Sequence, residues 1–221
     1  MSSAARFFQV IQARDTAAVK RMLAAEPELA TARNEKGQSA LLLTIYGGNK
    51  ELRDTLLASG APLEVHEAAA LGDLERVKHL VEKEPVLAKS YSPDGFPVVA
   101  LAAVFGQREV AEYLFAKGAD INAAATNGTG YNALTGAVAS GHTAIVSWLL
   151  ANSADPNYRY GTGYSPLLTA AANGHLGIAS ILLASGADLH AQSNDGKTAL
   201  RIAEERGHPG VAEFLRDSGA K

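Results

Sequence analysis

The sequence predicts an all-α solenoid of stacked helix-turn-helix units with short β-hairpin fingers. A Gly-His pair begins at Gly141, Gly174 and Gly207, at intervals of 33 residues. The same frame continues towards the N-terminus with one turn glycine in each unit: Gly106, Gly72 and Gly48. An apolar residue lies seven positions before each of these glycines: Leu41, Val65, Val99, Leu134, Leu167 and Leu200. Self-similarity at a period of about 20 to 50 residues is the signature of stacked repeats.

The sixth unit illustrates the two short helices that each unit is expected to form. Residues 165–173 give the first helix, with Pro166 tolerated in its first turn. Gly174 ends this helix, because glycine readily adopts the left-handed conformation found at a helix C-terminus. Residues 176–184 give the second helix, which Gly186 ends. Helices of about nine residues are unstable alone, so small alanines pack the two together and stacking buries a continuous core.

Several stretches resemble an ankyrin repeat. Its start is matched by Gly196-Lys197-Thr198-Ala199-Leu200 and by Tyr164-Ser165-Pro166-Leu167. Its ending is matched by Leu182-Leu183-Ala184-Ser185-Gly186-Ala187-Asp188. The resemblance runs from about Phe7 to Ala220, and residues 67–73 are similar to bacterial ankyrin-repeat proteins. It implies a curved stack whose inner helices line a concave face, with fingers along one edge.

We expect residues 1–221 to form a single domain of seven units. The expected units are 4–36, 37–61, 62–94, 95–127, 128–161, 162–194 and 195–221. The first unit has Arg14 where the turn glycine should lie and carries Gln9 and Gln12, and the last unit is rich in charge. Terminal units of a solenoid need a polar outer face. These two units are therefore interpreted as caps of a complete stack.

One interval in the repeat is too short to contain a finger. Gly48 and Gly72 lie only 24 residues apart. Residues 60–64 run almost directly into the helix that contains His66 and Leu71. The sequence therefore predicts a notch in the row of fingers between the second and third units.

Composition narrows the possible classes of function. The formal net charge is −3, whereas proteins that bind nucleic acids or membrane surfaces carry a basic excess. There is no cysteine, which excludes disulfides, thiolate metal sites and a cysteine nucleophile. No apolar run approaches the roughly 20 residues that span a bilayer. We expect a cytoplasmic protein that binds neither nucleic acid nor membrane.

Several motifs could suggest cofactor, metal or catalytic sites, but the repeat explains each of them better. Residues 128–133 match a dinucleotide-binding pattern, but no apolar strand precedes them, so they are interpreted as a fingertip. His142, His175 and His208 recur once per unit, about 10 Å apart along the stack, too far to share a metal ion. Their imidazoles are expected to bond loop backbone instead. Asp120, Asp155 and Asp188 recur in the same way and are expected to bond local backbone. We therefore expect no enzyme activity, no metal and no cofactor.

The middle of the chain carries the candidate binding residues. Residues 121–180 contain only two charged side chains, Asp155 and Arg159, and interface cores are poor in charge and rich in aromatic residues. The residue after the finger glycine is aromatic in three consecutive units, and Arg159 could supply hydrogen-bond donors and stack on a ring. The residues expected to bind a partner are Phe96, Phe105, Tyr131, Tyr158, Arg159, Tyr160 and Tyr164.

The preferred hypothesis is a module that binds an unidentified protein partner through these fingertips and the concave face of the central repeats. A preformed surface of this kind loses little freedom on binding. One alternative is a structural homodimer that uses the same uncharged face, since identical patches suit twofold symmetry. Another is small-molecule binding. The aromatic residues could also simply cover the hairpin backbone and the tightly packed, alanine-rich units.

Overall fold

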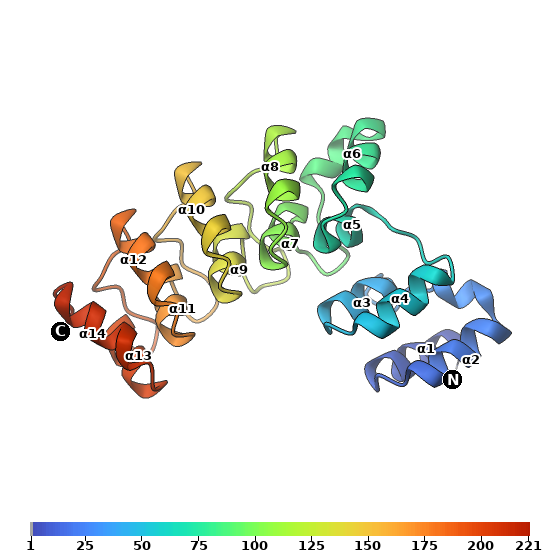
Figure 1. Cartoon of the computed structure of the whole chain (residues 1–221), viewed down its shortest axis with the longest axis horizontal. Coiled ribbons are helices and arrows are strands. Elements are labelled where there is room, and N and C mark those ends of the chain that lie inside the picture. Colours follow the sequence, from blue (N-terminus) through green and yellow to red (C-terminus); the bar gives the residue numbers. More distant parts are fainter. Residues whose placement is uncertain (1) are drawn as a thin grey trace.

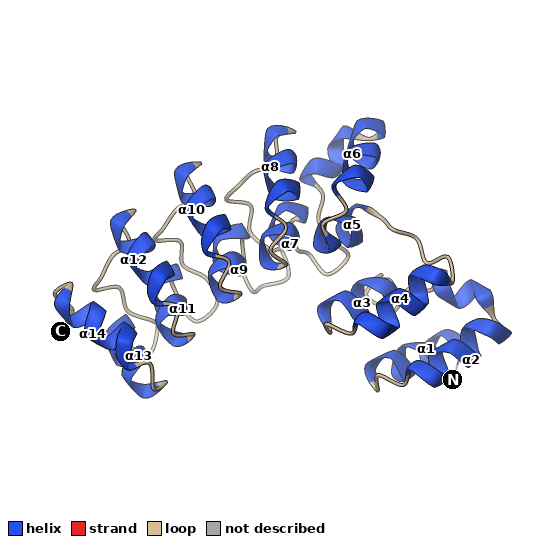
Figure 2. Cartoon of the chain, in the orientation of Figure 1, coloured by secondary structure: helices blue, strands red, loops and turns tan. Residues whose placement is uncertain are grey.

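The structure, a computed structural model, describes residues 2–221, and this range contains fourteen α-helices in seven consecutive pairs (Figures 1 and 2). The first helices of the pairs are α1 (Ser3–Gln12), α3 (Ala40–Tyr46), α5 (Val65–Leu71), α7 (Val98–Val104), α9 (Ala133–Ala139), α11 (Pro166–Ala172) and α13 (Ala199–Glu205). The second helices are α2 (Thr16–Ala25), α4 (Lys50–Ala58), α6 (Leu74–Lys83), α8 (Arg108–Ala116), α10 (Thr143–Ala151), α12 (Leu176–Ala184) and α14 (Pro209–Asp217). Two 3-10 helices, η1 (Pro27–Thr31) and η2 (Pro85–Lys89), follow α2 and α6.

The helix pairs stack side by side in an arched row (Figure 1). From α5 to α14, the first helices lie along one side of the row and the second helices along the other. The predicted all-α solenoid is confirmed. Within residues 2–221, no helix is long and apolar enough to cross a membrane.

The helices of the sixth pair begin and end where the repeat pattern predicts. Ser165 caps α11 by accepting a hydrogen bond from the Leu168 N–H, which satisfies a donor at the open helix end. Gly174 then has φ +71° in the turn between α11 and α12. The equivalent position in the first pair is Arg14, which has φ +57°, a conformation that costs energy for any residue with a Cβ.

The fingers between pairs are shorter than hairpins with true strands. In the described part of the chain they contain single isolated bridges, at Arg33–Ser39, Tyr91–Pro97, Tyr160–Tyr164 and Gln192–Thr198. Neighbouring fingers are joined by backbone hydrogen bonds from Thr126 N–H to Gly95 O, Gly161 N–H to Thr129 O and Asn194 N–H to Thr162 O. From the fourth pair onwards the fingers therefore support one another along one edge of the solenoid.

The short interval between α4 and α5 lacks a finger, as predicted, but the notch is closed. Residues 59–64 form a plain connection with no bridge. The fingers on either side meet, because a Cβ placed on Gly37 would lie 3.4 Å from the Cβ of Pro93. Removing one finger has therefore brought the second and fourth pairs within reach of each other.

The recurring polar residues hold the stack together. The Nε2 atoms of His142 and His208 lie 3.1 Å from the carbonyl oxygens of Val104 and Ala172 in the preceding pair. Gln107 takes the place of this histidine and donates to the Ala70 carbonyl at 3.2 Å. The predicted backbone role is confirmed for these two histidines; no such bond from the His175 imidazole is present within residues 2–221.

The recurring aspartates form local turns. Asp120, Asp155 and Asp188 each accept a hydrogen bond from the backbone N–H two residues further on, at 2.9, 2.8 and 2.9 Å. This confirms the expected backbone role. Within the described residues, no group of three or more His, Cys, Asp or Glu side chains could hold a metal ion.

The buried side chains form three clusters along the stack. The first cluster lies mainly in α1–α4, the second in α5–α8, and the third runs from α7 to α14. The second and third share helix α7, and the first and second share helix α5, which places Ala70 in the first cluster and Val65, Ala68 and Ala69 in the second.

Candidate functional site

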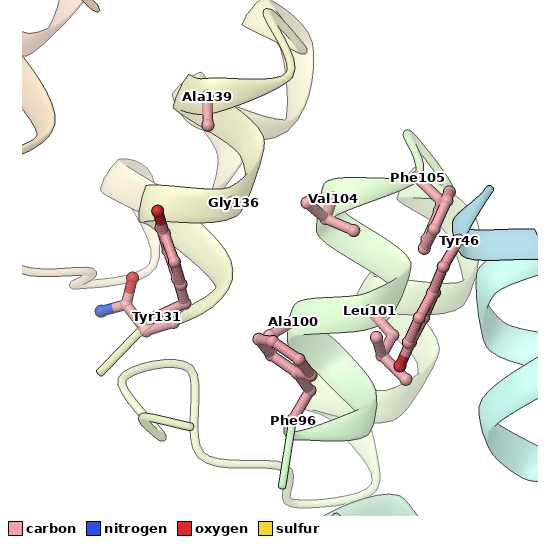
Figure 3. Close-up of a pocket in the computed structure, with 10 residues that line it drawn as sticks. Tyr46, Phe96, Ala100, Leu101, Val104, Phe105, Tyr131, Gly136 and Ala139 are labelled. Atoms are coloured by element: carbon pink, nitrogen blue, oxygen red, sulfur yellow. The ribbon is translucent and has the colours of Figure 1, made fainter. Parts of the chain in front are cut away.

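An apolar pocket of about 330 Å³ opens on the side of the solenoid formed by the first helices. Its lining is Tyr46, Phe96, Ala100, Leu101, Val104, Phe105, Tyr131, Asn132, Gly136 and Ala139. Figure 3 shows Ala100, Leu101 and Val104 along α7, with Tyr131 on the α9 side and the paired rings of Tyr46 and Phe105 on the opposite side. The floor is aliphatic and both flanks are aromatic.

The two phenylalanines of the pocket mark the ends of α7. Phe96 directly precedes Pro97, the N-cap residue, and Phe105 is the C-cap residue. The first helix of this pair places an alanine and a leucine between them on the pocket side, at Ala100 and Leu101. The helix therefore presents a small apolar floor between two large rings.

Tyr46 reaches the pocket from the end of α3, across the intervening helix α5. Its ring stacks on Phe105, with centroids 6.1 Å apart and planes at 6°, and meets the edge of Phe96 at 6.5 Å. Its hydroxyl donates to Asp94 Oδ1 at 3.2 Å. Helix α5 allows this crossing because its middle residues are the buried alanines Ala68, Ala69 and Ala70.

The ionisation state of Tyr46 follows from this position. Burial, and then the nearby Asp94 carboxylate, raise the pKa of the phenol above its ordinary value. The phenol therefore stays protonated at neutral pH and donates its hydrogen bond to Asp94. The lining otherwise contains one phenol, on Tyr131, and one amide, on Asn132. The Asn132 side-chain oxygen is already used as the cap of α9.

A second, more polar hollow adjoins the apolar pocket. It has a volume of about 460 Å³ and is lined by Thr129, Tyr131, Ala139, Tyr160, Gly161, Thr162, Tyr164, Thr169, Ala172, Asn173 and Arg206. Tyr131 and Ala139 line both spaces. We call the two adjoining spaces together the groove; their lining residues come from the second helix pair to the seventh.

The predicted binding residues divide into two groups. Phe96, Phe105 and Tyr131 line the apolar pocket, and Tyr164 lines the polar hollow together with Tyr131 and the largely buried Tyr160. Tyr131 is the most exposed of the tyrosines along this groove, at 38%. Side chains of this group present contact surface to the groove.

The other group supports the first from within. Tyr160 is buried and its hydroxyl pairs with Thr169, while its ring lies 4.9 Å from that of Tyr131. The Tyr158 hydroxyl donates to Gly130 O at 2.8 Å. Arg159 acts as a hydrogen-bond donor, since its guanidinium donates to the Gln192 carbonyl in the next finger. These side chains fix the fingertips in place.

Two groove residues were missed by the choice of binding residues from sequence. Arg206 lies directly before its turn glycine, at the position where Phe105 was chosen, whereas Tyr46 lies two positions before Gly48, in the register of Val104. The two positions before each turn glycine were the signal that could have found both residues. Tyr46 contributes to the site only because the missing finger brings its unit close to the fourth.

A buried carboxyl lies behind the groove, in the first turn of α5. Glu67 is 2% exposed and accepts a hydrogen bond from the Ser39 hydroxyl at 2.6 Å. Its other oxygen has no hydrogen-bond partner among residues 2–221. Burial raises the pKa of this carboxyl above its ordinary value. Burial has the opposite effect on the neighbouring His66, because it lowers the pKa of the imidazole to about 4.

We expect the substitution Glu67→Gln to stabilise the protein at pH 8 by about 1 kcal/mol. A carboxyl whose folded pKa is raised favours the native state below its unfolded pKa, and this contribution is lost as the pH rises through the folded pKa. The gain over wild type should therefore be largest at pH 7–8 and should vanish near pH 4. Urea denaturation at a series of pH values measures it.

The matched control for this prediction is Glu109→Gln. Glu109 also lies in the first turn of a helix, α8, but is exposed, so its substitution should give no pH-dependent gain. His66 is present in every variant, and its own pH dependence cancels in the comparison. A gain that is equal at pH 4 and pH 8 would show that the Glu67 charge is not the cause.

Comparison with known families fits this architecture. The family model described as ankyrin repeats (3 copies) matches residues 65–160 and again residues 134–221. The comparison with curated proteins finds no match. Ankyrin repeats are in general protein–protein interaction modules and typically non-enzymatic. Because the two matches together cover more than half of the chain, which folds throughout into stacked helix pairs, the protein belongs to the ankyrin-repeat family.

Proposed function

We propose that the protein is a non-enzymatic module of seven ankyrin units, bounded as expected from the sequence, that binds a partner protein in the groove. The observation that carries this proposal is the apolar pocket on the face of the first helices. A contiguous apolar concavity flanked by aromatic side chains is the usual setting of an interface hot spot. The partner would place a large apolar side chain over α7, between Tyr131 and Tyr46.

The aromatic side chains of the groove are held in place before a partner binds. Binding would therefore cost little conformational entropy. Tyr46 is fixed by its stack on Phe105 and its bond to Asp94. Tyr131 rests on the buried ring of Tyr160. Because these rings are already ordered, little rotamer freedom is lost on binding. A preformed surface of this kind suits recognition of a folded or extended protein segment.

The chemistry of the lining favours binding over catalysis. Acid–base catalysis needs a group whose pKa lies near the working pH. The described lining residues of the apolar pocket offer two phenols and an amide, and the pKa of Tyr46 is raised rather than lowered. These groups suit contact and hydrogen bonding to a partner.

Replacing Tyr131 by alanine should weaken partner binding at least about tenfold, because truncation of a central aromatic anchor is the costliest change in an interface. The probes are ten-residue peptides selected on the wild-type protein from a random phage-display library. Affinity is measured by fluorescence anisotropy, and the fold is checked by thermal denaturation. Double substitution of Tyr131 and Tyr164 should abolish binding without unfolding the stack.

The matched control is Tyr91→Ala, because Tyr91 is equally exposed, at 42% compared with 38% for Tyr131, but lies outside the groove. Peptides that lose affinity equally with both variants, or with neither, would contradict the proposed site. Light scattering of the free protein gives a separate check. A dimer that competes with the peptides would assign the groove to a second copy.

A further inference from the structure

The groove has two chemically different ends. The apolar pocket has no charged residue in its described lining, and the polar hollow has one, Arg206. The two spaces share Tyr131 and Ala139 and therefore lie side by side on the same face. A segment that lies along the groove therefore meets an apolar site first and a single cation at the far end.

The charge of Arg206 is not neutralised by its neighbours. Arg206 is exposed and forms no ion pair or hydrogen bond with residues 2–221 through its guanidinium. The two glutamates before it are already paired: Glu205 binds Lys197 at 2.7 Å and Arg201 at 2.8 Å, and Glu204 binds Arg216 at 2.6 Å. A guanidinium in this state is well suited to bind a carboxylate through two parallel hydrogen bonds.

The spacing between the two ends sets the length of the segment. The apolar site lies over α7 in the fourth pair, and the polar hollow is centred on the sixth pair, because its lining comes from the fifth, sixth and seventh pairs. At about 10 Å per pair, the separation along the stack is roughly 20 Å. An extended chain rises about 3.3 Å per residue and covers this distance in about six residues.

The polar hollow offers hydrogen-bonding groups to an extended backbone. The hydroxyls of Thr162 and Tyr164 line it and have no hydrogen-bond partner among residues 2–221. A helix satisfies its own backbone groups, whereas an extended segment needs external donors and acceptors. These unused hydroxyls favour an extended occupant.

We infer that the groove binds an extended segment of the partner protein that carries a large apolar side chain and, about six residues away, an aspartate or glutamate that pairs with Arg206. This inference rests on the proposed function, since it names the chemistry of the segment that the groove receives. The apolar residue occupies the pocket over α7, and the acidic residue lies in the polar hollow.

The test uses ten-residue random peptides displayed on phage and selected on the wild-type protein. The selected peptides should share an aromatic or large aliphatic residue with an acidic residue five to seven positions away. A synthetic copy of the best peptide, acetylated and amidated at its ends, is then compared with its Glu→Gln or Asp→Asn form. At low salt the neutral form should bind about threefold to tenfold more weakly.

A double-mutant cycle assigns this effect to Arg206. The Arg206→Gln variant should bind the acidic peptide as weakly as the wild-type protein binds the neutral peptide. It should also bind the acidic and neutral peptides equally well. Arg206→Glu should prefer a peptide with lysine at that position. The control is Arg21→Gln, an equal loss of charge on exposed residue 21 of α2, which should leave the affinity unchanged.

The outcomes separate this inference from the proposed function. Peptides that depend on Tyr131 but show no acidic preference, or no coupling to Arg206, overturn the inference and leave the proposed function standing. Peptides whose binding is unaffected by Tyr131→Ala, or a failure to select any peptide, overturn both. A dimer of the chain that occupies the groove in solution also overturns the inference.

Discussion

The substitution Leu134→Ala should lower the free energy of unfolding by about 2–5 kcal/mol, the range for a leucine removed from a well-packed core. Leu134 lies in α9 and is fully buried in the cluster that runs from α7 to α14. The stability of a solenoid is approximately the sum of unit stabilities and the interfaces between neighbours. A cavity in a central unit weakens that unit and both of its interfaces.

Urea denaturation followed by circular dichroism measures this loss. Leu176→Ala is the matched control, because Leu176 is a leucine in α12 of the same cluster region but is 44% exposed. It should change the stability by no more than about 0.5 kcal/mol. A similar small change for Leu134 would mean that α9 is not packed between its neighbours as the structure shows.

The stacked fold could be predicted from the sequence because its signals are local and recur in each unit. Gly174 and Gly186 end two helices at a fixed spacing, and Asp155 forms a turn with a backbone group only two residues away. Features of this kind depend on short-range chemistry that the chain repeats. Because the turn glycine recurs from Gly48 to Gly207, the interpretation holds even where Arg14 departs from the pattern.

The groove could be predicted only in part, because its shape depends on contacts between units. The sequence showed that a finger is missing, but not that the fingers on either side would meet at Gly37 and Pro93. It also placed Arg159 among the binding residues, but could not show that a carbonyl 33 residues away, at Gln192, accepts a hydrogen bond from its guanidinium. Partners that lie one repeat away in sequence meet only when the units stack, and local chemistry does not specify which atoms then come into contact.

The short interval also predicts where the solenoid opens first. No backbone hydrogen bond joins the finger before α3 to the finger before α7 in the described residues. The contacts that cross this junction include the Arg33–Glu64 ion pair, the Ser39–Glu67 hydrogen bond and the ring of Tyr46. Because the exposed ion pair contributes little, Tyr46 should carry much of the coupling between α1–α4 and the rest of the chain.

We therefore expect Tyr46→Ala to destabilise α1–α4 selectively, by about 2–4 kcal/mol. Removing the ring takes away the stack on Phe105, the contact with Phe96 and the bond to Asp94. Native-state hydrogen exchange should show faster exchange of the α1–α4 amides and little change in α9–α14.

The substitution Tyr46→Phe separates the contribution of the ring to stability from that of the hydroxyl. It keeps both aromatic contacts and loses only the Asp94 hydrogen bond, so it should retain most of the protection of α1–α4. Uniformly faster exchange along the whole chain in Tyr46→Ala would show that the junction is no weaker than the others. Unchanged exchange would show that the stack of Tyr46 on Phe105 carries no coupling. Selective opening would instead show that, where one finger is lost, Tyr46 is a principal link between the N-terminal helices and the rest of the chain as well as one flank of the apolar pocket.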